Sequence, residues 1–318
     1  MINIVDKIKL YVYIILRMLP VGNHFRLWLT KEIGREYYSK KLFLKAKNEY
    51  QKAIKLNAKD YLSNLALGWI SKNEGFHEEA IQYYSYAMAL DPCRVEPIND
   101  LGLLYADMGA YSQAMKYFNK ALELNKDVDS IFNNIAYVYE LEGDYLNSIK
   151  YLSKAIEINN ISTYYYRRGI AKLKRNMYSE AAEDFKKVSD LDPSNSVNLF
   201  RYGATLYRLG LFRDAIDISR QALSIKRDYH LPYITIASSY AELGELDEAL
   251  KYIDLAIKFG FDDPSSHYNK GYIMYLKGNN QQALKELLVC MKMQPDYNDA
   301  KNLALKIQRE ERFDSTGQ

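Results

Sequence analysis

Residues 95–128 read VEPINDLGLLYADMGAYSQAMKYFNKALELNKDV, and the same arrangement of small and large residues returns along most of the chain. The glycine at position 102 belongs to a series spaced 34 residues apart, in which one step is 33 residues and alanine twice replaces glycine. The series is Gly34, Gly68, Gly102, Ala136, Gly169, Gly203, Ala237 and Gly271. A fixed period of this length predicts stacked copies of one supersecondary unit instead of a single globule.

A second series follows seven residues after the first and contains glycine with one asparagine. Its members are Gly75, Gly109, Gly143, Asn176, Gly210, Gly244 and Gly278. Both residue types tolerate the left-handed backbone conformation that ends one helix before another runs back. Small residues such as Ala114 and Ala121 recur further on, and large residues such as Leu101, Tyr105 and Phe118 lie between them at helical spacing. Each unit is therefore predicted to be a pair of closely packed antiparallel helices.

This pattern resembles the tetratricopeptide repeat, which has glycine or alanine at position 8, alanine at 20 and 27, an aromatic residue at 24 and proline at 32. The resemblance covers about nine tenths of the chain. It divides residues 27–297 into eight repeats, 27–60, 61–94, 95–128, 129–161, 162–195, 196–229, 230–263 and 264–297. It implies an all-α, right-handed superhelical solenoid of about eight helix pairs with capping helices at both ends. Arg168, Lys172 and Lys270 stand where the family has an apolar contact, so packing is expected to differ in the fifth and eighth repeats.

Two segments lie outside the repeats, residues 1–26 and residues 298–318. The first is basic and amphipathic, with an apolar face formed by Ile2, Val5, Ile8, Val12, Ile15, Leu16 and Leu19. Two interpretations stay open: a helix that caps the first repeat, and a helix whose residues 2–19 lie on an anionic membrane surface. Its apolar run is too short to span a bilayer, and it lacks the cleavage site of a signal peptide. The second segment is predicted to be a solvating helix with Ala300 and Ile307 inward, followed by a frayed tail from Arg309.

Charge, cysteine and histidine usage exclude several classes of function. The formal net charge of +3 is carried by the first 26 residues, so the neutral repeats lack a general attraction to nucleic-acid backbones. Cys93 and Cys290 lie in distant repeats, so no disulfide between them is expected. The four histidines are not spaced as metal ligands, and no nucleotide loop or nucleophile motif occurs. We therefore predict no metal, no cofactor and no catalysis, in a cytoplasmic protein.

Function is then expected on the surface that stacking creates. In the tetratricopeptide family, positions 2, 5, 6, 9, 12 and 13 of each first helix line an inner groove. On this basis the predicted partner-binding residues are Asn133, Asn134, Tyr137, Tyr166, Arg167, Lys174, Arg201, Tyr207 and Arg208. Upstream, the same positions turn acidic at Glu96, Asp100 and Asp107. Arg167 and Arg201 share one register in neighbouring repeats, and two exposed guanidinium groups there suit a carboxylate or phosphate on an extended peptide.

The sequence therefore predicts a non-catalytic scaffold whose groove holds an extended or helical segment of a protein or peptide partner, with an acidic or carboxylate feature. The family's carboxylate clamp is matched only at Asn133 and Arg201, so a complete clamp is not expected. A plainer interpretation is that Arg167 and Arg201 solvate the groove or pair with Glu140. The alternatives are a membrane-peripheral recruitment factor and a peptide-responsive regulator, which would need an output partner. Partner identity and oligomeric state are not predicted.

Overall fold

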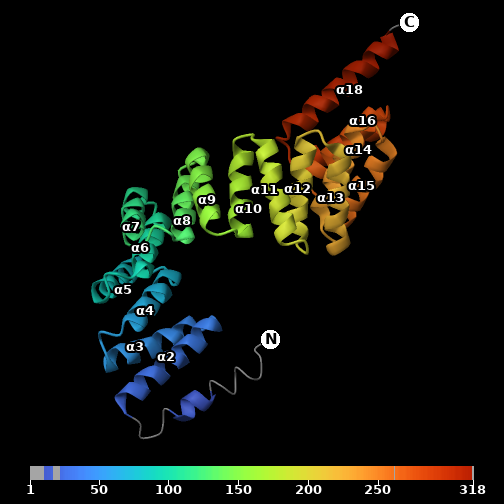
Figure 1. The fold of residues 1–318 in the computed structure, drawn as a ribbon. Helices are drawn as coiled ribbons and strands as arrows, with labels where there is room; N and C mark the ends of the chain where they lie inside the picture. The colour runs from blue at the N-terminus through green and yellow to red at the C-terminus, as the bar shows by residue number, and fades with distance from the viewer. Residues whose placement is uncertain (1–10, 17–21, 261, 317–318) are drawn as a thin grey trace. The chain divides into compact units, whose positions relative to one another are not determined.

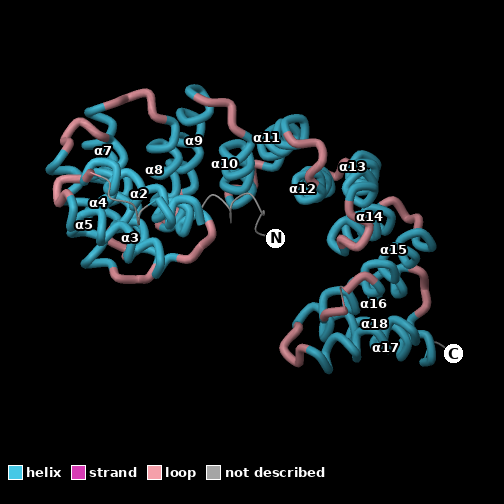
Figure 2. The backbone as a smooth tube through the Cα atoms, turned by 90° about the horizontal axis from the view of Figure 1, so that it is seen from below, coloured by secondary structure: helices cyan, strands magenta, loops and turns pink. Residues whose placement is uncertain are grey.

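The computed structural model describes residues 11–16, 22–260 and 262–316, with side chains described up to Glu311. Every regular element in these ranges is an α-helix, and no strand occurs in them (Figures 1 and 2). The chain forms two compact parts, Met1–Asp144 and Tyr145–Gln318. The expected all-α helical-repeat solenoid is confirmed.

The first part contains three complete helix pairs and the first helix of a fourth. The bounds are α2 Asn23–Ser39, α3 Phe43–Leu56, α4 Tyr61–Asn73, α5 His77–Leu90, α6 Val95–Asp107, α7 Tyr111–Leu124 and α8 Asp129–Leu141. Each second helix also packs against the first helix of the following pair, as α3 does against α4. Helix α2 begins before residue 27, where the first repeat was expected to start.

The second part continues this alternation from the second helix of the fourth pair to a final single helix. The bounds are α9 Tyr145–Ile158, α10 Ser162–Lys174, α11 Tyr178–Leu191, α12 Ser196–Arg208, α13 Phe212–Ile225, α14 His230–Glu242, α15 Leu246–Lys258, α16 Pro264–Leu276, α17 Asn280–Met293 and α18 Asn298–Thr316. First helices of successive pairs also touch, α12 with α14 and α14 with α16.

The first glycine series sets how closely the two helices of a pair approach. A Cβ atom added at Gly68 would lie 2.5 Å from the ring of Tyr84, and one added at Gly169 would lie 2.9 Å from the ring of Phe185. In each case the neighbour is the residue 16 positions later, so the large side chain of the second helix fills the space that glycine leaves. The sixth repeat differs, because Gly203 faces the hydroxyl of Ser219. The predicted equivalence of these glycine sites is confirmed.

The second series ends the first helix of each pair in the left-handed conformation. The angle φ is +57° at Asn176 and between +75° and +80° at the six glycines, as predicted. In the first repeat the same position is Lys41, with φ of +58°. In this conformation the Cβ atom of lysine lies too close to the backbone carbonyl oxygen, so the turn at Lys41 is strained where the glycine turns are not.

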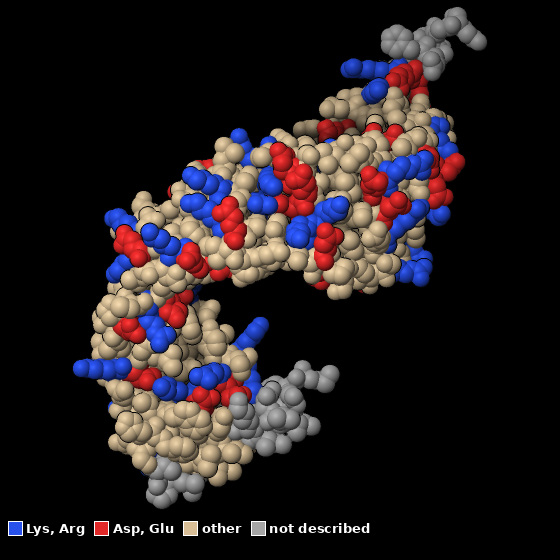
Figure 3. Space-filling view, in the orientation of Figure 1, with Lys and Arg blue, Asp and Glu red and all other residues tan. Residues whose placement is uncertain are grey.

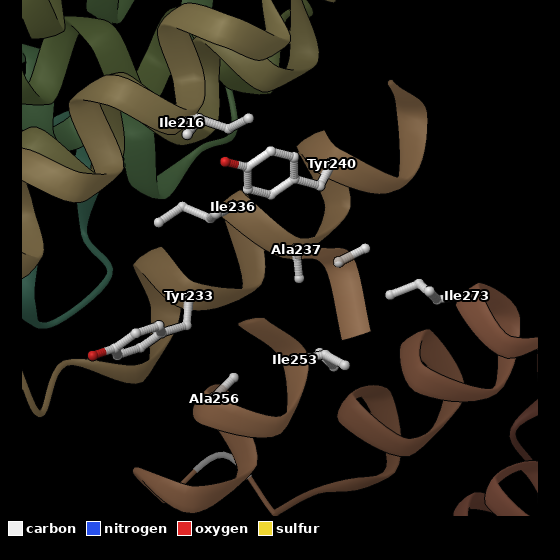
Figure 4. Packing of buried hydrophobic residues seen from close by; sticks show 9 residues of the cluster. Ile216, Tyr233, Ile236, Ala237, Tyr240, Ile253, Ala256 and Ile273 are labelled. Carbon is white, nitrogen blue, oxygen red and sulfur yellow. The ribbon is translucent and has the colours of Figure 1, made fainter. Parts of the chain in front are cut away.

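The interior is a row of small apolar clusters between neighbouring helices. In the second part, Ile236 and Tyr240 of α14 lie among Ile216 of α13, Ile253 of α15 and Ile273 of α16 (Figure 4). Such contacts reach only the adjacent helices, which is the stability pattern of a repeat protein.

The charged residues at apolar positions are buried or half-buried, and each has partners of opposite charge. Asp184 of α11 is 2% exposed and accepts from Arg168 Nη2 at 2.6 Å and lies 2.8 Å from Lys172 Nζ. In the eighth repeat, Glu286 of α17 lies 2.9 Å from Lys270 Nζ and 2.6 Å from His267 Nδ1. The expected departure in packing at these repeats is therefore a pair of compensated charge clusters.

Helix α18 packs against α16 and α17. It buries Ala300, Leu303, Ala304 and Ile307 and exposes Asn302 and Lys306. The helix continues past Arg309 to Thr316, where a frayed tail was expected, because no glycine or proline interrupts it.

Residues 11–16 are helical, and Tyr13 packs edge-on against Trp28 of α2 at 5.9 Å between ring centroids. The rest of the predicted N-terminal apolar face, Ile2, Val5, Ile8 and Leu19, lies outside the described residues. Within the described ranges, we find no helix with the length and apolarity needed to cross a bilayer.

Candidate functional site

The predicted groove positions lie on the first helices, and each part presents its own set of them. We call these surfaces the inner faces: Trp69, Asn99, Asp100 and Asn134 belong to the first part, and Tyr166, Arg201, Tyr207 and Tyr272 to the second. First helices of neighbouring repeats contact each other, as α6 does with α8 and α12 with α14. Side chains from successive repeats therefore meet on one surface within each part.

Amide side chains connect two repeats on the inner face of the first part. Asn134 Nδ2 of α8 donates to Asn99 Oδ1 of α6 at 2.7 Å, and Asn133 Nδ2 donates to Asn134 Oδ1 at 3.4 Å. Tyr137, one turn further along α8, is half-buried. The structure thus connects Asn133 and Asn134 with Asn99, which the prediction omitted.

A tryptophan and a carboxyl group link α4 to α6 on the same face. Trp69 Nε1 donates to Asp100 Oδ2 at 2.5 Å. Burial raises the pKa of Asp100 to about 6, although the bond from Trp69 and the positive charge of Lys72 oppose this shift. Trp69 was not among the predicted partner-binding residues, which all lie in the fourth, fifth and sixth repeats. It occupies position 9 of the second repeat, so the same rule applied from residue 61 would have found it.

In the second part, Arg201 lies among aromatic side chains. Its Cζ atom is 5.7 Å from the centre of the Phe200 ring, and Phe200 meets Tyr229 edge-to-face at 5.5 Å. Burial raises the pKa of Tyr229, while the charge of Arg201 lowers it and nearby Tyr166 raises it. We call Tyr166, Phe200, Arg201 and Tyr229 the Arg201 site. Its most unusual atom is the Nε of Arg201, which is buried and has no hydrogen-bond partner among the described residues.

The remaining predicted residues differ in exposure and contacts. Arg167 and Arg201 were expected to be exposed, but both are half-buried. For Arg201, the ring of Phe200 lies against the guanidinium group. Lys174 is exposed. Arg208 is also exposed, and its Cζ atom lies 6.0 Å from the ring centre of Tyr178 at the start of α11.

Tyr207 continues the inner face from α12 towards α14 and α16. Burial raises its pKa, the charge of Glu242 adds to this shift, and a hydrogen bond with Ser238 opposes it. The charge of Tyr272 on α16 also raises the pKa of Tyr207. The inner face of the second part thus combines phenol hydroxyls with the Nε–H of Arg201, which has no acceptor in the part of the chain that the structure describes.

Other kinds of site find no support in the described ranges. No group of three or more His, Cys, Asp or Glu side chains there is arranged to hold a metal ion. Cys93 is exposed, Cys290 is buried, and both thiols are free. On the face shown in Figure 3, Lys and Arg side chains are interspersed with Asp and Glu instead of forming one basic surface.

Known proteins resemble this chain in two ways: its sequence matches family models, and its fold matches solved structures. One family model described as tetratricopeptide repeat matches residues 97–128, and a second with the same description matches 32–60, 129–161, 162–195 and 232–259. A solved tetratricopeptide repeat protein from Parabacteroides merdae has a TM-score of 0.53, with 16% identity over 78% of this chain and 98% of that chain. At this identity the structural likeness shows the fold alone.

Two curated proteins are similar in sequence. The chain is 26% identical over 170 residues to DnaJ homolog subfamily C member 3 of Gallus gallus, which is 46% of this chain and 34% of that protein. It is 27% identical over 105 residues to Protein STIP1 homolog of Dictyostelium discoideum, which is 33% of this chain and 18% of that protein. The chain therefore spans about a third or less of the curated relatives it matches.

Proposed function

This chain belongs to the tetratricopeptide repeat family, whose repeats form protein-interaction scaffolds, and from this premise we propose that it holds an extended segment of a partner protein at the Arg201 site. The segment carries a carboxylate, from an acidic side chain or a C-terminus. The scaffold has no chemical step: its inner face binds and positions the partner.

The observation that carries this proposal is the buried, unpartnered Nε of Arg201. Leaving such a donor unsatisfied costs about 1–3 kcal/mol, and a carboxylate on a bound segment would supply the missing acceptor. Guanidinium and carboxylate groups match in a two-bond geometry that lysine cannot reproduce. The flanking rings of Phe200 and Tyr229 would exclude water from that contact.

The test is binding of a fluorescein-labelled acidic peptide, measured by anisotropy with the full chain, beside the same peptide with glutamine for each glutamate and an amidated C-terminus. We expect the acidic peptide to bind more tightly. Replacing Arg167→Gln together with Arg201→Gln should weaken its binding at least tenfold, and Arg201→Lys should weaken it to a smaller extent because the charge remains. Equal affinity for both peptides would contradict the proposal.

A matched control removes two cations from second helices. Lys186 of α11 and Arg213 of α13 are both exposed, and the pair Lys186→Gln with Arg213→Gln changes the net charge equally. Loss of binding in this control as well would point to long-range electrostatics instead of the Arg201 site. Circular dichroism of all variants checks that the helices persist.

A second candidate function is peripheral membrane binding, and exposed apolar residues near the N-terminus favour it. Tyr11 is 68% exposed, Ile15 58% and Trp28 44%. Co-sedimentation with vesicles of phosphatidylcholine and phosphatidylserine should then fall when Val12→Glu and Ile15→Glu are combined. The control, Leu288→Glu with Leu305→Glu, alters two other exposed apolar residues and should leave co-sedimentation unchanged.

A further inference from the structure

A pocket lies on the inner face of the first part, between α2 and α4. It encloses about 200 Å³ and is lined by Lys31, Arg35, Tyr38, Tyr50, Leu62, Ala66 and Trp69. Leu62 is 48% exposed and Trp69 is 37% exposed, so two large apolar side chains face solvent there. We call this cavity the Trp69 pocket.

The volume restricts what the pocket can hold. Small-molecule sites usually enclose roughly 300–1,000 Å³, and this pocket is below that range. It has room for one apolar side chain, not for a cofactor or a drug-sized metabolite. Leu62, Ala66 and Trp69 would contact such a side chain on several sides and remove their own surface from water.

The cations at the pocket rim are already neutralised by the protein. Lys31 Nζ lies 2.8 Å from Asp60 Oδ1, and Arg35 Nη1 lies 3.0 Å from Glu32 Oε1. The pair of Lys31 and Asp60 is largely shielded from solvent, with side-chain exposures of 21% and 11%. These cations therefore do not need an anionic ligand to neutralise them.

The carboxyl group of Asp100, beside the pocket, is not neutralised in the same way. Asp100 accepts the indole N–H of Trp69, and among the described residues no ammonium or guanidinium group forms an ion pair with it. Lys72, the cation whose charge lowers the pKa of Asp100, is itself paired with Asp107 at 2.9 Å. Asp100 is half-buried, and carboxylates shielded from water are normally paired, so Asp100 lacks the cation that its position favours.

The geometry points to a second peptide-binding site in the first part: the Trp69 pocket takes one apolar side chain of a partner segment, and Asp100 takes a lysine or arginine of the same segment. The two subsites adjoin because the Trp69 ring lines the pocket while its N–H contacts Asp100. Side chains two positions apart in an extended segment lie on one side, about 7 Å apart along the chain. An apolar residue and a basic residue at that spacing would reach both subsites.

This site is distinct from the Arg201 site in residues and in charge preference. One selects a cation and the other an anion, so a single chain would recognise two differently charged segments. The two proposals fail separately: Asp100→Asn should leave binding of the acidic peptide unchanged, and Arg201→Gln should leave binding at the Trp69 pocket unchanged.

Intrinsic fluorescence gives a direct readout, since Trp28 and Trp69 are the two tryptophans of the chain. In the full-length Trp28→Phe variant, all indole emission comes from Trp69. The probe is acetyl-Gly-Ser-Leu-Ser-Lys-Ser-Gly-amide, beside matched peptides with serine for leucine or glutamate for lysine. We expect a saturable change in Trp69 emission with the probe, and at least tenfold weaker binding of both matched peptides.

Two variants in the same background assign the subsites. Asp100→Asn keeps an acceptor for Trp69 and should weaken the lysine peptide about tenfold while leaving the glutamate peptide unchanged, and Leu62→Ser should weaken both. Equal affinities for the lysine and glutamate peptides in the Trp28→Phe protein that retains Asp100 would overturn the proposal. The proposal would also be overturned if Trp69 emission did not change on adding peptide but depended on protein concentration, because the pocket would then be occupied by a second copy of the chain.

Discussion

Gly102 lies directly against the ring of Phe118, so close that a Cβ atom at residue 102 would stand 2.5 Å from Cε1 of that ring. Phe118 is fully buried. The two helices of the third repeat are thus held at a distance that only glycine permits.

The first prediction follows from this contact. Gly102→Ala should destabilise the protein by about 1–3 kcal/mol, because the added methyl group forces the ring or the helix to shift. Urea unfolding followed by circular dichroism measures the change. Gly102→Ala combined with Phe118→Ile should recover part of the loss, since Ala237 and Ile253 occupy the equivalent positions in one cluster of the seventh repeat. An unchanged midpoint in Gly102→Ala would contradict the packing described.

The second prediction concerns the first turn, where Lys41 has φ of +58°. Replacing Lys41→Gly should stabilise the protein by about 1 kcal/mol, because glycine adopts this conformation without steric cost. The reciprocal change, Gly109→Ala, should be destabilising although open space surrounds the site. Thermal unfolding of both variants tests the sign, and a lower midpoint for Lys41→Gly would show that the lysine makes a compensating contact.

The third prediction concerns the buried charges around Asp184. Asp184→Ala leaves the half-buried guanidinium of Arg168 and the ammonium of Lys172 without their shared carboxylate, and should cost about 3–5 kcal/mol. Replacing all three residues by apolar ones should cost less than the single change. Urea unfolding of the two variants decides this, and equal losses would mean that the packing volume matters more than the charge.

The fourth prediction is a pH dependence in the eighth repeat. Burial would lower the pKa of His267, but its contacts with Glu286 and Asp262 raise it above 6.5. Burial would raise the pKa of Glu286, but His267 and Lys270 lower it below 4.5. Because folding raises the pKa of His267, its protonated form contributes its full stabilisation below pH 6.5, and this contribution is lost as the pH rises through the pKa of the folded protein. Because folding lowers the pKa of Glu286, its ionised form contributes its full stabilisation above pH 4.5, and this contribution is lost as the pH falls through the pKa of the folded protein.

Both contributions are therefore complete between about pH 4.5 and 6.5. We expect the urea midpoint to fall between pH 5.5 and pH 8.5, and His267→Gln should reduce this fall. The groups that face His267 are Glu286, Asp262 and, through the shared Glu286, Lys270, which also lies 3.0 Å from Asp254. His24→Gln, at an exposed position of α2, is the control, and an identical pH profile in His267→Gln would refute the prediction.

The periodic features of the fold could be predicted because each depends on one backbone requirement. A small residue at Gly68 or Gly169 and a left-handed residue at Asn176 are visible without knowing any partner. The partners of Arg168 and Lys172 could not be predicted in the same way. Asp184 lies on the other helix of the pair, and a sequence pattern does not show which of several acidic residues turns inward.

The candidate site was predicted only in outline. The positions of Asn134 and Arg201 followed from the helix register. The aromatic surroundings of Arg201 did not, because they include Tyr229 at the boundary with the next repeat. The Trp69 pocket combines side chains of two first helices and one second helix, so its volume exists only after they pack. Register predicts which residues face a groove, whereas packing decides which of them remain without a partner.

Each glycine of the first series faces a side chain only 16 residues further along, so a protrusion and the hollow that receives it are encoded within the same 34-residue stretch. A gene duplication or loss that adds or removes one such stretch carries both halves of the fit with it. The length of this protein can therefore change by whole repeats during evolution without any change elsewhere in its interior.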